Sequence, residues 1–249
     1  RFAAFSLCIF DSETGVVRFC NAGDNLIRYF DASEQKLRSI TLPQTPAAGV
    51  LPNDLVMLKG GYQIHSFTLD HGDILLLYTD GIEEAKRKFR NRNFAEIICE
   101  HDGAPQDTPH GNHVVGQDNE ELGADRVEAI INAVMRHERY ELFKYHNPRG
   151  NITYHFDFTE CEGTVEDLIM AMVSVEKIFR MWKNDSDHSG RKILVDKKVD
   201  SFLRRHFVEY SIYCGETAEY SENPAYLYYL NVREDEQYDD LTILGIKHR

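Results

Sequence analysis

The sequence lacks any apolar run that approaches the roughly 20 residues needed to span a bilayer, and its N-terminus has no signal-peptide pattern. Both absences predict a cytoplasmic protein without a membrane segment in this chain. Positive charge is also scarce, since the net charge is -13 and no Lys/Arg-rich face offsets it. This balance argues against nucleic acid or an anionic membrane as the main partner and favours cations and basic surfaces.

Cysteines are few, and their spacing does not suggest disulfide pairs or a metal site. The chain has five, widely spaced and without a CxxC pair: Cys8, Cys20, Cys99, Cys161 and Cys214. An odd number in mostly apolar surroundings predicts reduced, buried thiols and excludes a disulfide framework. Internal repeats and low-complexity tracts are absent as well, which argues against a solenoid or a disordered chain.

What the sequence does have is enough apolar material for a core, with 42% hydrophobic residues in a chain of 249. Periodicity predicts strands first, helices in the middle and strands at the end. The predicted strands are a hairpin over 2–22, then 25–30, 62–69, 74–79, 226–232 and 241–246. We therefore expect an α+β fold with a largely antiparallel sheet that is closed by its last strands.

Between these strands the pattern changes to helical. Helices are predicted from 120 to 134, from 164 to 182 and from 196 to 210. Thr164 and Asp167 form a capping-box pattern at the start of the second helix. Its apolar stripe reads as core rather than as a partner groove: Leu168, Met172, Val175, Phe179 and Trp182. Residues 42–61, with three prolines, are predicted as loop, and 83–118 as a surface excursion.

Acidic residues stand at the ends of two predicted strands. Asp80 follows the apolar run "ILLLYT", and Asp239 with Asp240 precedes "LTILGI". In an antiparallel pair the end of one strand lies beside the start of its neighbour, so these carboxylates are expected to meet. Such a cluster of hard oxygen ligands suits Mg²⁺ or Mn²⁺. The alternative is that Asp80-Gly81 is only a turn and Asp239-Asp240 only a solvated strand start.

Three stretches, in this order, resemble the SpoIIE/RsbU-type branch of the metal-dependent serine/threonine phosphatases (PPM, protein phosphatase 2C-like). They are "VVRFCNAG", "LDHGDILLLYTDGIEEA" and "DDLTILGI". The resemblance implies a protein phosphatase 2C-like β-sandwich flanked by helices, and residues 142–230, which match no family motif, are expected to add an enlarged helical region in the C-terminal half. It also implies a binuclear Mn²⁺ or Mg²⁺ centre with Asp80 and Asp239 as metal ligands. Thr79, Gly81 and Asp240 belong to the same motifs beside the ligands.

The implied reaction is hydrolysis of a phosphoprotein by a metal-activated water, without a phospho-enzyme. The implied substrate is a phosphorylated regulator of the anti-sigma-factor antagonist type in bacterial signalling. The family's other ligands lie in upstream acidic motifs, and nothing in residues 1–68 matches them. Either the upstream part is not in this chain or this member is degenerate. The chain is interpreted as a single phosphatase domain over 1–249 that lacks its N-terminal part, with an upstream sensor domain as a candidate partner.

Several residues do not fit the family pattern. Residues 142–230 match none of its motifs and are interpreted as an inserted helical subdomain, either regulatory or simply extra packing. Asp24, where relatives often have His, receives no role. Glu83 and Glu84 are interpreted as helix-start charges. His110 and His113 have ligand-like spacing in a polar loop, and the basic run 86–92 is either a solvated flap or a contact for a phosphoprotein.

A second hypothesis comes from a different class of protein. A phosphatase fold that has lost its metals could act as a non-catalytic interaction module that binds a signalling partner through residues 142–230. Acidic motifs before Arg1 would favour the enzyme, and their absence would favour the module. An EF-hand-type cation domain is disfavoured, because no loop of alternating acidic residues occurs.

Overall fold

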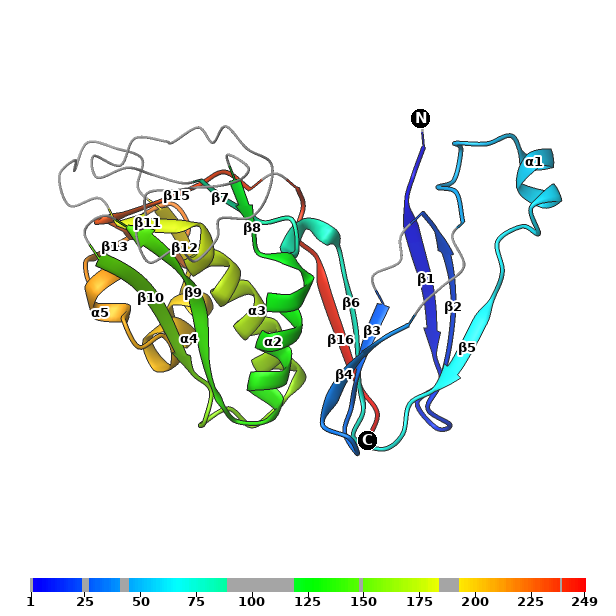
Figure 1. Ribbon diagram of the computed structural model, residues 1–249, viewed down its shortest axis with the longest axis horizontal. Helices are drawn as coiled ribbons and strands as arrows, with labels where there is room; N and C mark the ends of the chain where they lie inside the picture. Colours follow the sequence, from blue (N-terminus) through cyan, green and yellow to red (C-terminus); the bar gives the residue numbers. More distant parts are fainter. Residues whose placement is uncertain are drawn as a thin grey trace. The chain divides into compact units, whose positions relative to one another are not determined.

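The computed structural model divides the chain into two compact units, Arg1–Thr79 with Thr242–Arg249, and Asp80–Leu241. It describes residues 2–23, 27–40, 45–88, 119–147, 150–183, 193–237 and 239–249. Strands and helices are mixed. The first unit consists mostly of strands, and most of the helices lie in the second unit (Figure 1). The predicted α+β class is confirmed.

The first unit contains two antiparallel sheets. One has the order β1-β2-β5 and the other β16-β6-β3-β4. The strands are β1 (Phe5–Phe10), β2 (Val16–Ala22), β3 (Ile27–Asp31), β4 (Lys36–Ser39), β5 (His65–Thr68), β6 (Ile74–Tyr78) and β16 (Ile243–Lys247). The predicted hairpin is β1 with β2, and the last strand of the chain pairs with β6 as expected.

The two sheets of the first unit pack face to face. Val17 and Phe19 of β2 contact Ile27 of β3 and Leu75 of β6 in one buried cluster. Alternate residues of each strand point to opposite faces, so the inward ones form this core while their neighbours face outward. The first unit is therefore a small β-sandwich, as the sequence predicted.

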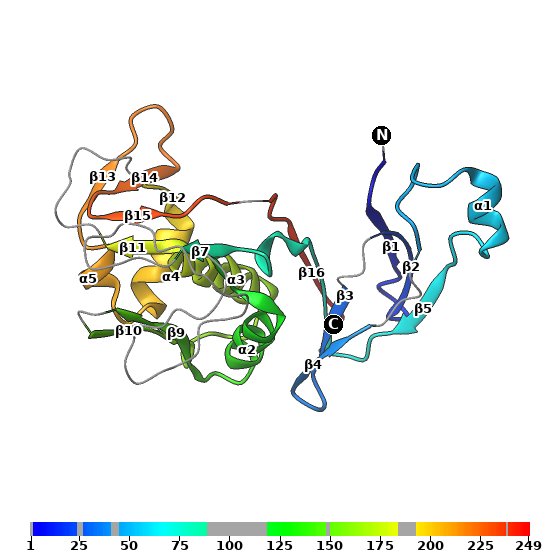
Figure 2. The ribbon, with the colours of Figure 1, turned by 45° about the horizontal axis from the view of Figure 1, so that its top comes forward.

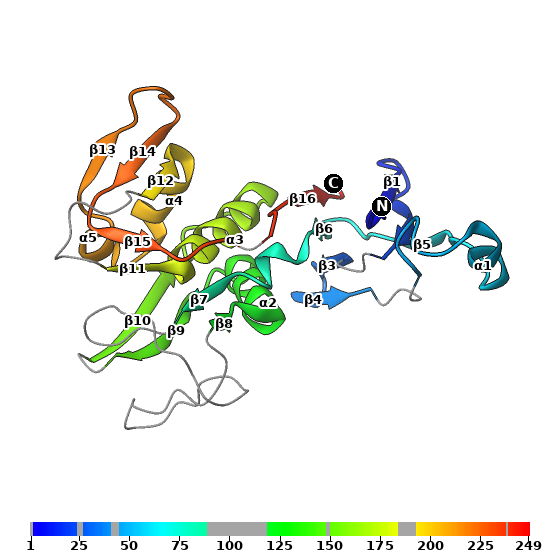
Figure 3. The ribbon, with the colours of Figure 1, turned by 90° about the horizontal axis from the view of Figure 1, so that it is seen from above.

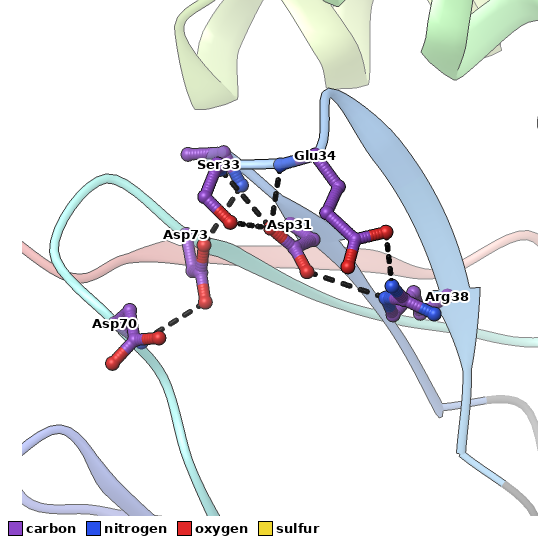
Figure 4. Close-up of polar contacts among 7 residues, drawn as sticks. Asp31, Ser33, Glu34, Arg38, Asp70 and Asp73 are labelled. Carbon is purple, nitrogen blue, oxygen red and sulfur yellow. Dashed lines mark hydrogen bonds and ion pairs between the residues drawn. The ribbon is translucent and has the colours of Figure 1, made fainter.

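The Gly-Asp pair before β6 has a structural role in this sandwich. Asp73 is 4% exposed, and its two carboxylate oxygens accept hydrogen bonds from Ala32 N (2.8 Å) and Asp70 N (2.9 Å) (Figure 4). The first bond reaches the turn between β3 and β4, and the second closes the turn before β6. Asp73 thus fixes two neighbouring turns at the end of the sandwich where β6 begins.

We expect Asp73→Ala to lower the free energy of unfolding by about 1.5–3 kcal/mol, since two partly buried hydrogen bonds to a buried carboxylate are lost. Urea denaturation monitored by circular dichroism measures this loss. Asp70→Ala is the matched control, because the Asp70 side chain is exposed and the bonds to Asp73 use only the Asp70 backbone. An equal loss in both variants would contradict the role of the Asp73 carboxylate.

The stretch 42–61, predicted as loop, contains a short helix. Helix α1 (Asn53–Leu58) begins directly after Pro52, whose carbonyl accepts hydrogen bonds from Leu55 N and Val56 N. Proline disrupts a helix only in its interior and is well tolerated at the start. The prediction that the prolines exclude any regular element here is therefore wrong.

In its described residues, the second unit combines four α-helices and one 3₁₀ turn with short antiparallel sheets (Figures 2 and 3). Its helices are the 3₁₀ turn η1 (Asp80–Ile82), α2 (Gly123–Met135), α3 (Val165–Arg180), α4 (Lys197–His206) and α5 (Tyr210–Tyr213). Its strands are β7 (Lys86–Lys88), β8 (Asn119–Glu121), β9 (Arg139–Asn147), β10 (Gly150–Asp157), β11 (Met181–Lys183), β12 (Ile193–Asp196), β13 (Thr217–Glu219), β14 (Tyr226–Tyr229) and β15 (Val232–Glu234). Within the described ranges, no helix has the length and apolar character needed to cross a bilayer.

Helix α3 is the centre of the second unit and packs against α2 and α4. The predicted capping box is present, with Asp167 N donating to the Thr164 hydroxyl and Thr164 N donating to the Asp167 carboxylate. The predicted apolar stripe from Leu168 to Phe179 is fully buried and confirms the core interpretation. The helix ends at Arg180, so Trp182 belongs to β11 instead.

Residues 142–230 hold helices α3, α4 and α5, and also strands that the sequence analysis did not predict. Their status as an inserted subdomain stays a prediction. Asp24, Cys99, His110, His113 and residues 89–92 lie outside the described residues. The four described cysteines are free thiols, of which Cys161 and Cys214 are buried. Burial raises the pKa of each of these two thiols to about 12.

Candidate metal centre

The turn after β6 presents acids on one side and apolar residues on the other. Asp80 opens η1, and Glu84 N donates to Asp80 O at 2.8 Å, which closes one further turn of chain. Ile82 and Ala85 are buried in the second unit, whereas Asp80 and Glu84 are exposed. The pattern of "DGIEEA" therefore directs two carboxylates to the same side, four residues apart.

The rest of this turn is bound to the start of α2. Gly123 N donates to Glu83 O at 2.8 Å, and Leu122 N donates to Ala85 O at 2.9 Å. Strand β7 then continues the chain and pairs with β8. No helix begins at Glu83 or Glu84, so the interpretation of these residues as helix-start charges is wrong. These acids instead belong to a turn in which the carbonyl oxygens of Asp80, Glu83 and Ala85 accept backbone hydrogen bonds.

Gly81 allows the second acidic segment to lie against this turn. A Cβ atom built at position 81 would lie 2.5 Å from the backbone oxygen of Asp240 and 3.3 Å from that of Asp239. Any side chain there would have to push the Asp239-Asp240 backbone away, because real Cβ atoms do not approach backbone oxygen so closely. The glycine of "TDG" is thus explained by packing against "DD".

Thr79 and Thr242 hold together the two places where the chain leaves and re-enters the sandwich. Thr79 N donates to Thr242 O, and Thr242 N donates to the Thr79 hydroxyl, both at 3.0 Å. These bonds extend the pairing of β6 with β16 beyond its last strand residues, Tyr78 and Ile243. The prediction that these two strand ends are neighbours is confirmed.

Three carboxylates converge at this point of the second unit. Oxygen atoms of Asp80, Glu84 and Asp239 all lie within 4.8 Å of one another, and this is the group of potential metal ligands found among the described residues. Asp239 is further fixed by Gln237, whose amide donates to its backbone oxygen at 2.9 Å. One Asp239 carboxylate oxygen also accepts from Asp240 N at 2.7 Å.

The donor chemistry of this cluster fits a hard divalent cation. Carboxylate oxygens are the ligands that Mg²⁺ and Mn²⁺ prefer, and three negative charges so close together repel one another unless a cation compensates them. The exposure of all three side chains leaves room for water molecules to complete the coordination. An open, polar depression beside them is lined by Gln237, Asp239, Asp240 and Leu241.

Asp80 and Asp239 lie together, as the sequence predicts, whereas Glu84 joins them although it was interpreted as a helix-start charge. Its spacing of four residues from Asp80 was the available signal. That signal was ambiguous, because the same spacing in a polar turn is common without any ligand role. Asp240 lies beside the cluster, and its carboxylate is not among the three that converge.

One family model matches the N-terminal part of the chain. Residues 1–112 match the model of stage II sporulation protein E (SpoIIE), so the match includes Asp80 and Glu84 but ends well before Asp239. No curated protein sequence matches the chain.

Among solved structures, the RsbU and RsbW domains of Rv1364c from Mycobacterium tuberculosis match at 23% identity and a TM-score of 0.29, covering 38% of this chain and 23% of that one. The phosphatase domain of the cell fate determinant SpoIIE from Bacillus subtilis matches at 19% identity and a TM-score of 0.25, covering 33% of each chain. The chain thus spans about a quarter to a third of these structures. The resemblance to SpoIIE/RsbU-type phosphatases that the motifs predicted is confirmed by the SpoIIE match over residues 1–112.

Proposed function

We propose that this chain contributes part of the active site of a metal-dependent serine/threonine protein phosphatase. The observation that carries the proposal is the convergence of Asp80, Glu84 and Asp239 from two distant segments. The SpoIIE match over residues 1–112 supports the same reading, because it includes the first of these segments.

In this proposal Asp80 and Asp239 are ligands of a Mn²⁺ or Mg²⁺ ion, and Glu84 is an additional ligand. A divalent cation bound there supplies positive charge that lowers the pKa of bound water and neutralises phosphoryl oxygens. The chain's own contribution is to hold the carboxylates in place. Gly81 lets the two segments approach, and Gln237 fixes the backbone of Asp239.

The substrate that we propose is a phosphoserine or phosphothreonine protein of the anti-sigma-factor antagonist type, acted on in the cytoplasm. The free thiols of the described cysteines are consistent with a reducing compartment. Three carboxylates are fewer than a binuclear centre needs, so we further propose that the complete protein supplies the remaining ligands from other residues.

The test is Mn²⁺-dependent hydrolysis of p-nitrophenyl phosphate and of a phosphothreonine peptide, by this chain and by the longest native form of the protein. Each reaction is run with and without EDTA. Metal-dependent turnover by the longest form supports the phosphatase. If neither form hydrolyses either substrate, the phosphatase proposal is overturned and a non-catalytic interaction module is favoured.

The role of Glu84 can be tested against its immediate neighbour. Glu84→Gln is expected to weaken Mn²⁺ binding about tenfold, or ~1.4 kcal/mol, because a charged ligand becomes a neutral one. Glu83→Gln is the matched control. It removes the same charge from the neighbouring residue, whose side chain does not belong to the converging group. Isothermal titration calorimetry measures both affinities.

Equal losses of affinity in the two variants would mean that only general negative charge matters at this turn. The assignment of Glu84 as a ligand would then be wrong.

A further inference from the structure

The last turn of α3 contacts both segments that lead to the carboxylate cluster. On one side, the Phe179 ring lies 5.7 Å from the guanidinium carbon of Arg87, which belongs to β7 and follows Glu84 by three residues. Phe179 is fully buried and Arg87 is 5% exposed. A buried cation against an aromatic face is a favourable contact and orients β7 relative to the helix.

On the other side, Arg180 binds the segment that leads to Asp239. Its Nη1 donates to Asp235 O at 2.7 Å, and its own backbone oxygen accepts from Asp235 N at 3.0 Å. Both residues are 5% exposed. The backbone donor and acceptor of Asp235 are thus both bound to a single residue of α3, four residues before Asp239.

Glu176 holds the Arg180 guanidinium in the orientation that this contact requires. Its carboxylate forms an ion pair with Arg180 Nε and lies 3.4 Å from Nη2, one turn earlier in the helix. Glu176 is 2% exposed, so the pair is shielded from water and salt. A second ion pair joins Lys177 to Glu234 in the same segment.

Between β15 and β16 the described residues, 235–237 and 239–242, have no regular structure. Asp239 is held there by the contact of Asp240 with Gly81, by the Gln237 amide and by the anchor at Asp235. Loss of the Arg180 side chain would remove the bond to Asp235 O, and only the backbone bond from Asp235 N would still join Asp235 to Arg180. Asp239 would then sample positions away from Asp80 and Glu84.

We infer that Arg180 is a positioning residue, which sets the cation affinity of the Asp80, Glu84 and Asp239 cluster by fixing Asp235 through a guanidinium oriented by Glu176. The inference rests on the proposed function, since it concerns the same three carboxylates. It also gives a role to part of the segment 142–230, for which the family resemblance provides none. The segment carries the helix that connects the two halves of the cluster.

The test uses the double variant Glu176→Leu/Arg180→Met in the full chain. The double change is preferred because a single one would leave a buried charge unpaired and endanger folding, whereas apolar replacement of both partners is usually tolerated. Mn²⁺ affinity is measured by calorimetry, hydrogen exchange of the amides in 235–241 by mass spectrometry, and global stability by the urea midpoint. Arg205→Met is the control, because that arginine, near the end of α4, contacts Ser201 and Phe202 of its own helix.

We expect the double variant to bind Mn²⁺ about 10–100-fold more weakly, the usual effect of removing a residue that orients a ligand. Exchange of 235–241 should accelerate while the urea midpoint stays near that of the wild type. Arg180→Lys, which keeps a charged donor, should lose less affinity than the double variant. The control should match the wild type in all three measurements.

The outcomes separate this inference from the proposed function. Unchanged exchange in 235–241 overturns the positioning role, whatever the metal result. Faster exchange with unchanged Mn²⁺ affinity overturns the link to the cluster. A wild-type chain that binds no Mn²⁺ through Asp80 and Asp239 overturns the proposed function and, with it, the effect on affinity, while the exchange result still reports on the anchor itself.

Discussion

Asp80→Asn and Asp239→Asn should each reduce Mn²⁺-dependent phosphatase activity about 100-fold or more in the intact protein. A metal ligand contributes several kcal/mol to the stabilisation of transition-state charge, and each ~1.4 kcal/mol is a factor of ten in rate. The control is Glu236→Gln, which removes an equal charge from an exposed side chain three residues before Asp239. Initial rates with p-nitrophenyl phosphate at saturating Mn²⁺ measure the effect.

The stability of Asp80→Asn relative to the wild type should depend on whether metal is present. In EDTA, Asp80→Asn is expected to be at least as stable as the wild type, because it relieves repulsion among three nearby carboxylates. In Mn²⁺ at about 100 times the dissociation constant, the wild type should gain ~2.7 kcal/mol and the variant much less. A variant that is destabilised equally in both conditions would mean that Asp80 serves the fold and not a cation.

Gly81→Ala should remove cation binding without touching any ligand. The added Cβ would meet the backbone of Asp240 at 2.5 Å, so the Asp239-Asp240 segment must shift away from Asp80. Overpacking of this kind typically costs about 1–3 kcal/mol of stability as well. Mn²⁺ calorimetry and urea denaturation of the same samples separate the two effects.

Gly123→Ala is the matched control for this prediction. Gly123 has a φ of 77° and no atom within 4 Å of an added Cβ, so the substitution strains the backbone without displacing a neighbour. Its stability should fall by roughly 1–2 kcal/mol, while Mn²⁺ affinity should be retained. If Gly81→Ala binds Mn²⁺ as well as Gly123→Ala does, the close approach at Gly81 is irrelevant to the site.

The meeting of Asp80 and Asp239 could be predicted because it depends on a single strand pair. The apolar runs of β6 and β16 are strong signals, and antiparallel pairing alone then brings the end of one beside the start of the other. Glu84 could not be predicted in the same way. Its orientation depends on a 3₁₀ turn whose geometry follows from the burial of Ile82 and Ala85, and too few residues are involved to produce a periodic pattern.

The β9–β10 hairpin was missed although its signal is present. Tyr140 and Leu142 alternate with polar residues before "NPRG", and Tyr154 and Phe156 do so after it. All four side chains are buried, as a half-buried hairpin requires. The anchor at Arg180 is a different case, because a contact between residues 180 and 235 leaves no local trace in the sequence and arises from the pairing of β11, which follows α3, with β15.

The most direct test of the central claim is anomalous diffraction at the manganese edge from crystals of this chain grown with Mn²⁺. We expect a manganese peak bound by carboxylate oxygens of Asp80 and Asp239, at about 2.1–2.2 Å from each, the distance usual for hard cations of this size. A well-ordered structure in millimolar Mn²⁺ with no peak between these two residues would contradict it.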